Sequence, residues 1–126
     1  MDKLGLQKFH LMTENEYQNE IFFEISQLEL LNDSLFIFAV PNGELRDMPT
    51  AMKLKNMGVR RGISDLICMG NGKMLYIECK RIGGKQSDAQ KRFEGKVKKN
   101  GMTYILIDPS NPVVEVVNYV RLFFGI

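Results

Sequence analysis

The spacing of apolar residues predicts a long helix near the N-terminal end of the chain. Thr13 followed by Glu16 forms a capping-box start, because each side chain can bond the backbone amide of the other residue. The helix is then expected to run to about Leu31, since apolar residues recur every three or four positions at Tyr17, Ile21, Ile25 and Leu28. The polar residues 32–34 end it.

The same spacing predicts three further helices. A short one ends at Gly58, and its apolar positions are Ala51, Leu54 and Met57. A longer one starts at a second capping box, Ser87 with Gln90, and ends at Gly101, with its stripe at Ala89, Phe93 and Val97. A C-terminal helix has apolar residues at Val116, Val117, Val120 and Phe124.

Short apolar runs bounded by turn residues predict the strands between these helices. Leu35–Val40 and Met102–Ile107 are two of them, and Gly62–Lys80 is predicted to be a β-hairpin around Asn71-Gly72. The resulting order, α-β-α-β-β-α-β-α, indicates an α/β domain with a mixed central β-sheet flanked by helices. No linker divides the chain, so residues 1–126 are expected to form one domain, with residues 1–12 as a polar lead-in.

The hairpin places charged residues together if Asn71 and Gly72 are the two loop residues. Asp65 then lies directly opposite Glu78, and period-two alternation puts Lys80 on the same face as Glu78. Two adjacent carboxylates repel unless a cation lies between them, and their oxygens suit Mg²⁺ or Mn²⁺. A lysine beside such a metal can orient an attacking water. The alternative is a plain salt bridge of Lys80 with either acid on a solvated face.

Charge is distributed unevenly along the chain, although the formal net charge is only +2. Residues 14–47 hold eight acidic side chains and one basic one, whereas residues 53–100 hold 13 basic and four acidic ones. The basic stretch indicates a polyanionic partner. Several phenylalanines are expected in the core rather than as a base-stacking surface: Phe22, Phe23, Phe36, Phe38, Phe93, Phe123 and Phe124.

Scarce residue types narrow the chemistry. The single histidine, His10, lies in the polar lead-in, so neither a histidine-based triad nor a Cys/His zinc site is expected. Cys68 and Cys79 lie in apolar runs and are expected to pack as small hydrophobic side chains in a reducing compartment. No segment has the length of a membrane span or the core of a signal peptide, so an intracellular, cytoplasmic protein is expected.

Three blocks follow one another along the chain: Gly58–Leu66, which contains Val59-Arg60-Arg61, then Ile77–Arg81, then Ser87–Gln90. In this order and spacing they resemble the VRR-NUC nuclease domain of the PD-(D/E)XK superfamily. Pro41-Asn42-Gly43, together with Arg46 and the segment Ala51–Lys55 that follows, also resembles phage-type stand-alone members. The resemblance spans about Thr13 to the C-terminus and implies the restriction-endonuclease-like fold. Ser64 departs from the proline that the superfamily name expects.

The resemblance implies a role for each matching residue. Asp65, Glu78 and the backbone carbonyl of Cys79 would bind Mg²⁺ or Mn²⁺, and Lys80 would be the catalytic lysine. Gln90 matches a motif glutamine, although a capping role explains it equally well. A first-helix glutamate is also expected at the site. Glu16 matches it best and Glu20 is the reserve, while the alternatives for the two are a helix cap and a solvated helix face.

The implied activity is metal-dependent hydrolysis of DNA phosphodiester bonds, with branched, flapped or Holliday-junction-like DNA as substrate. The alternatives are a non-catalytic DNA-binding module and an RNA or nucleotide phosphohydrolase. A two-fold junction suggests a homodimer, with Val120–Ile126 at its interface and the monomer core as the alternative place for Phe123 and Phe124. Basic residues flanking the site are expected to bind DNA phosphates: Arg60, Arg61, Arg81, Lys85, Lys91 and Arg92.

Overall fold

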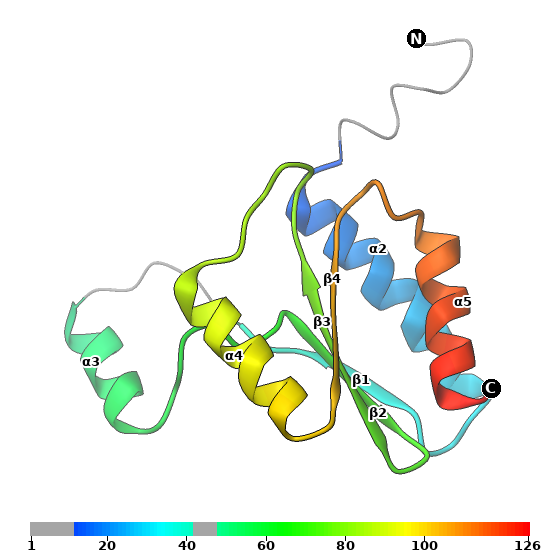
Figure 1. The fold of residues 1–126 in the computed structure, drawn as a ribbon, viewed down its shortest axis with the longest axis horizontal. Coiled ribbons are helices and arrows are strands. Elements are labelled where there is room, and N and C mark those ends of the chain that lie inside the picture. The colour runs from blue at the N-terminus through cyan, green and yellow to red at the C-terminus, as the bar shows by residue number, and fades with distance from the viewer. Residues whose placement is uncertain (1–11, 42–47) are drawn as a thin grey trace, which may run out of the picture.

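Four strands form one mixed sheet in the computed structural model, which describes residues 12–41 and 48–126 (Figure 1). The strands are β1 (Phe36–Ala39), β2 (Leu66–Gly70), β3 (Lys73–Cys79) and β4 (Thr103–Ile107), and they lie in that order across the sheet. The β1–β2 and β2–β3 pairs are antiparallel, whereas β3 and β4 are parallel. The parallel pair needs a crossover connection, and a helix supplies it.

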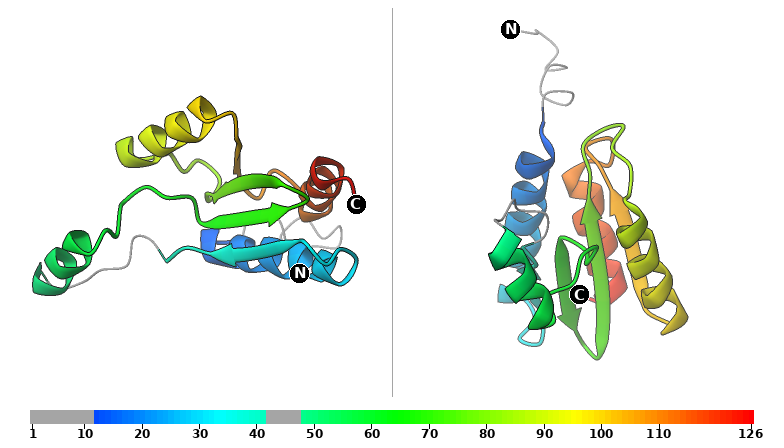
Figure 2. Two further views of the ribbon diagram at one scale, coloured as in Figure 1. Left: turned by 90° about the horizontal axis from the view of Figure 1, so that it is seen from below. Right: turned by 90° about the vertical axis from the view of Figure 1, so that its left-hand side faces the viewer.

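Helices cover both faces of the sheet (Figure 2). On one face lie α2 (Glu14–Gln27), which continues into the short 3₁₀ turn η1 (Leu28–Leu30), and α5 (Val113–Phe124). On the other face lies the crossover helix α4 (Asp88–Lys99), whose Phe93 packs edge-on against Tyr76 and Tyr104. A fourth helix, α3 (Met48–Asn56), stands away from the sheet. This is the predicted element order.

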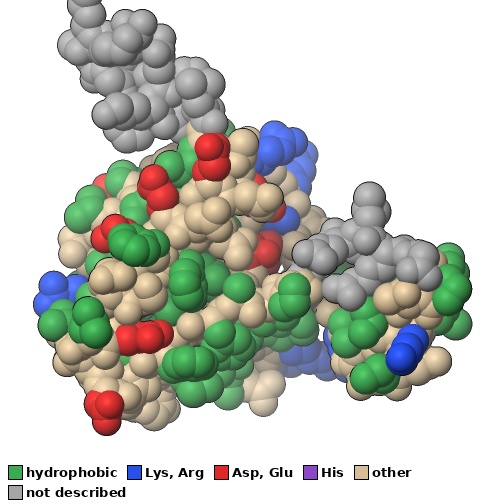
Figure 3. Space-filling view, turned by 180° about the vertical axis from the view of Figure 1, so that it is seen from behind, with side chains coloured by type: hydrophobic (Ala, Val, Ile, Leu, Met, Phe, Trp, Pro, Cys, Tyr) green, Lys and Arg blue, Asp and Glu red, His purple; other side chains and the backbone are tan. Residues whose placement is uncertain are grey.

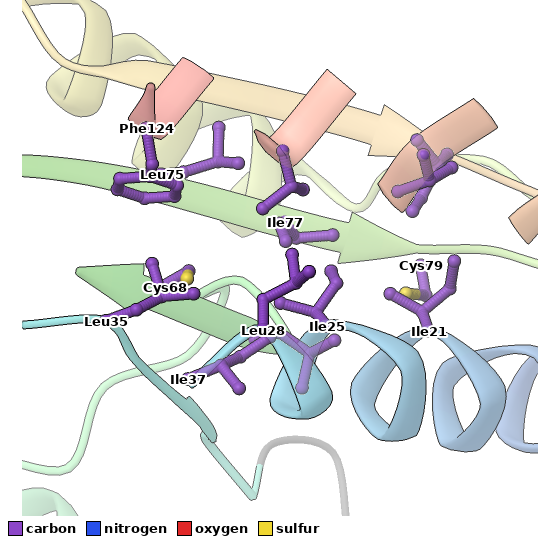
Figure 4. Packing of buried hydrophobic residues seen from close by; sticks show 14 of the residues in the cluster. Ile21, Ile25, Leu28, Leu35, Ile37, Cys68, Leu75, Ile77, Cys79 and Phe124 are labelled. Atoms are coloured by element: carbon purple, nitrogen blue, oxygen red, sulfur yellow. The ribbon is translucent and has the colours of Figure 1, made fainter. Parts of the chain in front are cut away.

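The core lies between the sheet and the α2–α5 pair. Ile77 and Cys79 of β3 point toward Ile21 and Ile25 of α2, and Phe124 of α5 closes the far end (Figure 4). All five side chains are at most 2% exposed. Each fully buried large apolar side chain contributes about 1.5–3 kcal/mol, so this face stabilises the domain. The residues between them in β3, including Glu78, therefore project to the α4 face.

The hairpin has the predicted register. Leu66 pairs with Ile77 and Gly70 with Lys73, so Asp65 falls opposite Glu78 by continuation of the same register. Asn71 and Gly72 have φ angles of 48° and 77°, as the predicted type I′ turn requires. The Asn71 side chain also donates to the Phe124 carbonyl oxygen at 2.7 Å, which ties the turn to the end of α5.

Both predicted capping boxes are present. Thr13 and Glu16 bond each other's backbone amides at the start of α2, and Ser87 and Gln90 do the same at the start of α4. Gly101, with φ of 72°, follows the end of α4. The boundaries predicted from capping residues are therefore confirmed to within about one turn.

The predicted burial of the phenylalanines is wrong at three positions. Phe22 and Phe23 are 38% and 58% exposed, because α2 turns Tyr17 and Ile21 toward the sheet instead. Phe36 is 54% exposed, because α4 packs against β4 and leaves the β1 edge uncovered. Figure 3, which views the molecule from behind, shows hydrophobic side chains at the surface of that side.

The C-terminal segment predicted for the dimer interface is partly buried. Val120 and Phe124 are 0% and 2% exposed, so these two members of the predicted dimer segment belong to the monomer core. His10, Asn42, Gly43 and Arg46 lie outside the described residues. None of the helices in the described ranges combines the length and apolar character that crossing a bilayer requires.

Candidate active site

Asp65 and Glu78 meet because the hairpin places them side by side at one end of its two strands. Asp65 immediately precedes β2, and Glu78 is the next-to-last residue of β3. The Asp65 Oδ2 atom accepts a hydrogen bond from the backbone amide of Cys79 at 2.8 Å, which holds this carboxylate beside β3. The Cys79 side chain itself lies in the core, where Cys68 is also buried with a free thiol, as expected for small hydrophobic residues.

Glu78 is the most unusual residue of the site, because a carboxylate is buried with only one oxygen satisfied. It is 1% exposed. Its Oε2 accepts from Gln90 Nε2 at 3.0 Å and lies 3.5 Å from Lys80 Nζ. Its Oε1 has no hydrogen-bond partner. Leaving a buried acceptor unpaired costs about 1–3 kcal/mol, and more if the group is charged, so a ligand at Oε1 would relieve a real penalty.

The pKa of Glu78 is raised from 4.5 to about 8. Burial is the main cause, because desolvation disfavours the charged form, and repulsion from Asp65 adds to it. Lys80 opposes both effects by its positive charge and its contact with Oε2. One lysine therefore does not compensate for two carboxylates at this site.

Gln90 joins the helix cap to the catalytic candidates. Its Oε1 accepts from the Ser87 amide at 2.8 Å, which is the capping contact, and also from Lys80 Nζ at 2.9 Å. Its Nε2 donates to Glu78. The two interpretations of Gln90 that the sequence left open are therefore compatible, because one amide group makes both sets of contacts.

Gly62 fixes the segment before Asp65 against the start of α4. A Cβ atom at Gly62 would lie 2.4 Å from the Ala89 carbonyl carbon and 2.8 Å from the Gln90 amide nitrogen. The φ angle of Gly62 is +84°, which also favours glycine. Ser64, at the position of the expected proline, is fully buried and donates to the Leu66 carbonyl oxygen at 3.2 Å. Backbone packing at this point thus positions Asp65 and Gln90 together.

The first-helix glutamates lie in different surroundings. The Glu16 carboxylate accepts from the Thr13 amide at 2.8 Å, and Glu20 lines an open groove between α2 and α5. Glu14, which the sequence analysis missed, is close enough to contribute to raising the pKa of the buried Cys79 thiol, after burial, Asp65 and Glu78. Its place in the first turn of α2, beside the capping residue Thr13, was the signal that the sequence offered. A site role for Glu16 stays a prediction.

The residues present fit a hard divalent cation. In the described ranges, no group of three or more His, Cys, Asp or Glu side chains has the arrangement of a metal site. The site instead offers the Asp65 and Glu78 carboxylates and the adjacent Cys79 backbone. This set of ligands is typical of Mg²⁺ sites, because Mg²⁺ is usually bound through one or two carboxylates and keeps several waters. The unpaired Glu78 Oε1 supports this assignment.

The predicted DNA-binding residues surround this site along the chain, and all of them are exposed. Arg81 and Lys85 lie in the loop between β3 and α4, and Lys91 and Arg92 lie in the first half of α4. Arg60 and Arg61 come before Asp65 in the segment that leads into β2. No contact in the described residues ties their charges to a carboxylate. Their binding to DNA stays a prediction.

Comparison with known proteins identifies the fold. No family model matches the sequence, and no match was found among curated proteins. A solved structure described as a "VRR_NUC domain protein" superposes with a TM-score of 0.62 at 21% identity, over 90% of this chain and 88% of that chain. The description of that structure names the same domain that the three sequence blocks resemble. The chain therefore has the fold of the VRR-NUC domain, which is the restriction-endonuclease-like PD-(D/E)XK fold.

Proposed function

We propose that this protein is a divalent-metal-dependent DNA endonuclease that hydrolyses phosphodiester bonds. The observation that carries the proposal is the buried Glu78, with an unpaired oxygen, beside Asp65 and within reach of Lys80. The VRR-NUC fold supports a nuclease rather than another phosphate-binding activity. The exposed basic residues around the site support a nucleic-acid substrate.

Each side chain of the site has a distinct role in the proposed reaction. Asp65, Glu78 and the Cys79 carbonyl would hold Mg²⁺ or Mn²⁺, which lowers the pKa of a bound water and neutralises charge on the phosphate. Lys80 has three ammonium hydrogens; one is donated to Gln90 at 2.9 Å and the ammonium group also faces Glu78 Oε2 at 3.5 Å, so a third hydrogen remains for the attacking water or a phosphate oxygen. Gln90 holds Lys80 and Glu78 in place, because it bonds both.

We propose branched, flapped or Holliday-junction-like DNA as the substrate and a homodimer as the active form, from the VRR-NUC resemblance. The structure changes which residues are available for the dimer interface. Val120 and Phe124 are in the core, whereas Leu122 in the same predicted segment is 83% exposed. Sedimentation at micromolar concentration tests this, and a monomer at every concentration contradicts the homodimer.

The activity is tested with the wild type, Asp65→Asn and Lys80→Ala on linear, flapped and four-way DNA in Mg²⁺ or Mn²⁺. Cutting that requires metal and is lost in both variants, with DNA binding retained, supports the nuclease. Asp88→Asn is the matched control, because Asp88 is an exposed acid at the start of α4 and is not one of the proposed site residues. DNA binding without cutting under every metal indicates a binding module. Cutting of RNA alone indicates the RNA phosphohydrolase.

A further inference from the structure

Helix α3 makes few packing contacts with the other described helices and strands. None of its residues is buried, and no described helix or strand packs extensively against it. Its Met48 and Met52 are 73% and 53% exposed. Isolated helices shorter than about 12–15 residues are marginal in water, and α3 has nine residues. A partner that contacts α3 would therefore stabilise it.

The charge of this region indicates what that partner is. From Met48 to Ser64 the chain has four basic residues and no acidic one. The basic residues are Lys53, Lys55, Arg60 and Arg61, and all four are exposed. Within the described residues none of them is paired with a carboxylate. Four exposed positive charges in α3 and the segment after it, with no carboxylate partner in residues 12–41 and 48–126, favour a partner with closely spaced negative charges.

The position of α3 relates it to the site. Seen from the end where α3 projects, α3 and α4 stand on either side of the β2–β3 hairpin (Figure 2, right). The segment after α3 is anchored where Gly62 abuts Ala89 and Gln90, in the first turn of α4. Gln90 in turn contacts Glu78 and Lys80. The basic segment therefore leads directly to the group formed by Glu78, Lys80 and Gln90. Lys91 and Arg92 follow Gln90 in α4.

We propose that α3 and residues 57–61 form a phosphate-binding wall, in addition to the basic residues of α4. This wall binds the sugar-phosphate backbone of a DNA duplex that also contacts α4. This proposal rests on the proposed nuclease function only in taking DNA as the ligand. The wall contributes affinity for substrates long enough to reach both helices, and it takes no part in the chemical step. Removing two phosphate contacts reduces the salt dependence of binding by a slope of about 1.8.

The test measures binding without cutting. Asp65→Asn protein in EDTA is titrated with duplex DNA of about 30 and about 8 base pairs, at about 50 and about 200 mM salt. Adding Lys53→Gln and Lys55→Gln is expected to lower the salt slope on the long duplex, so that the parent loses about 12-fold more affinity between the two salt concentrations than the variant does. The short duplex is expected to show a smaller difference. Lys73→Gln with Arg121→Gln is the control, because both residues are exposed and belong to β3 and α5, two elements that lie away from α3 in Figure 1.

Equal salt slopes for the parent and the α3 variant on the long duplex overturn the proposal. A second result also overturns the proposal: the protein is a dimer that dissociates when Met48 and Met52 are replaced by serine, while the lysine replacements leave DNA binding unchanged. In that case α3 contacts a second copy of the chain and not a duplex. Duplex RNA of equal length shows whether the wall accepts any phosphate backbone or DNA alone, and either result supports a phosphate-binding wall. A wild type that binds in this way but does not cut DNA refutes only the proposed nuclease function.

Discussion

Replacing Glu78 by glutamine is expected to stabilise the metal-free protein, and to do so increasingly as the pH rises. The carboxyl pKa is 4.5 in its ordinary state and about 8 in the fold, because Glu78 is buried and faces Asp65. Below pH 4.5 the group is protonated in both the folded and unfolded states. Between pH 4.5 and 8 only the unfolded state releases the proton, so the stability of the wild type falls as pH rises.

The magnitude follows from the same two pKa values. Each pKa unit corresponds to about 1.4 kcal/mol of free energy. The penalty is then below about 1 kcal/mol at pH 5 and about 4 kcal/mol at pH 8, a difference of roughly 3 kcal/mol. Solvent screening does not reduce it much, since Glu78 is 1% exposed. For a domain of 126 residues this corresponds to roughly 10 °C in Tm.

Thermal unfolding of the wild type and Glu78→Gln in EDTA from pH 5 to pH 8 measures the effect. The variant is expected to have the higher Tm at pH 8, and the gap is expected to close toward pH 5. Titrating groups that do not interact with Glu78 cancel in the difference between the two proteins, whereas Asp65 and Lys80 interact with it directly. Glu94→Gln is the control, since Lys98 lowers the pKa of Glu94 and its stabilisation is constant above pH 4.5. Parallel Tm curves for the wild type and Glu78→Gln would refute the reasoning.

Three further changes test neighbouring contacts. At pH 8, Mg²⁺ or Mn²⁺ is expected to raise the Tm of the wild type but not of Glu78→Gln, and an equal rise in both contradicts the assignment of Glu78 as a ligand. Gly62→Ala is expected to lower the free energy of unfolding by about 2 kcal/mol or more, because its Cβ would lie 2.4 Å from the Ala89 carbonyl carbon; urea unfolding measures this, and a loss under 0.5 kcal/mol contradicts the contact. Asn71→Ala is expected to cost about 1–2 kcal/mol, since it loses a 2.7 Å bond to Phe124 and strains a φ of 48°, whereas Asn71→Gly should restore the turn but not the bond.

The predicted pairing of Asp65 with Glu78 succeeded because local chemistry determines it. Asn71-Gly72 allows one turn type, that turn determines the register, and the register carries Asp65 to its place several residues away. The two capping boxes are equally local, because each involves residues three positions apart. Features that depend on contacts within a few residues were therefore readable from the sequence.

The failures all depend on which surfaces meet. In α2, Ile21, Phe22 and Phe23 are consecutive and apolar, and only packing against the sheet decides that Ile21 is buried. Phe36 and Ile37 alternate correctly in β1, but the extent of α4 leaves the Phe36 side uncovered. The unpaired Oε1 of Glu78 likewise requires the completed α4 face.

The shared use of the Gln90 amide has a consequence for local opening of the protein. Gln90 Oε1 is bonded to both the Ser87 amide and Lys80 Nζ, so fraying of the first turn of α4 releases Lys80 while the α2–α5 core remains intact. The cluster can thus be dismantled by a sub-global fluctuation that needs far less free energy than unfolding. Hydrogen exchange at the amides of Ser87 and Gln90 would then report the fraction of molecules with an assembled site. Because fraying of one turn exposes little surface, we expect that fraction to depend only weakly on denaturant, unlike global unfolding.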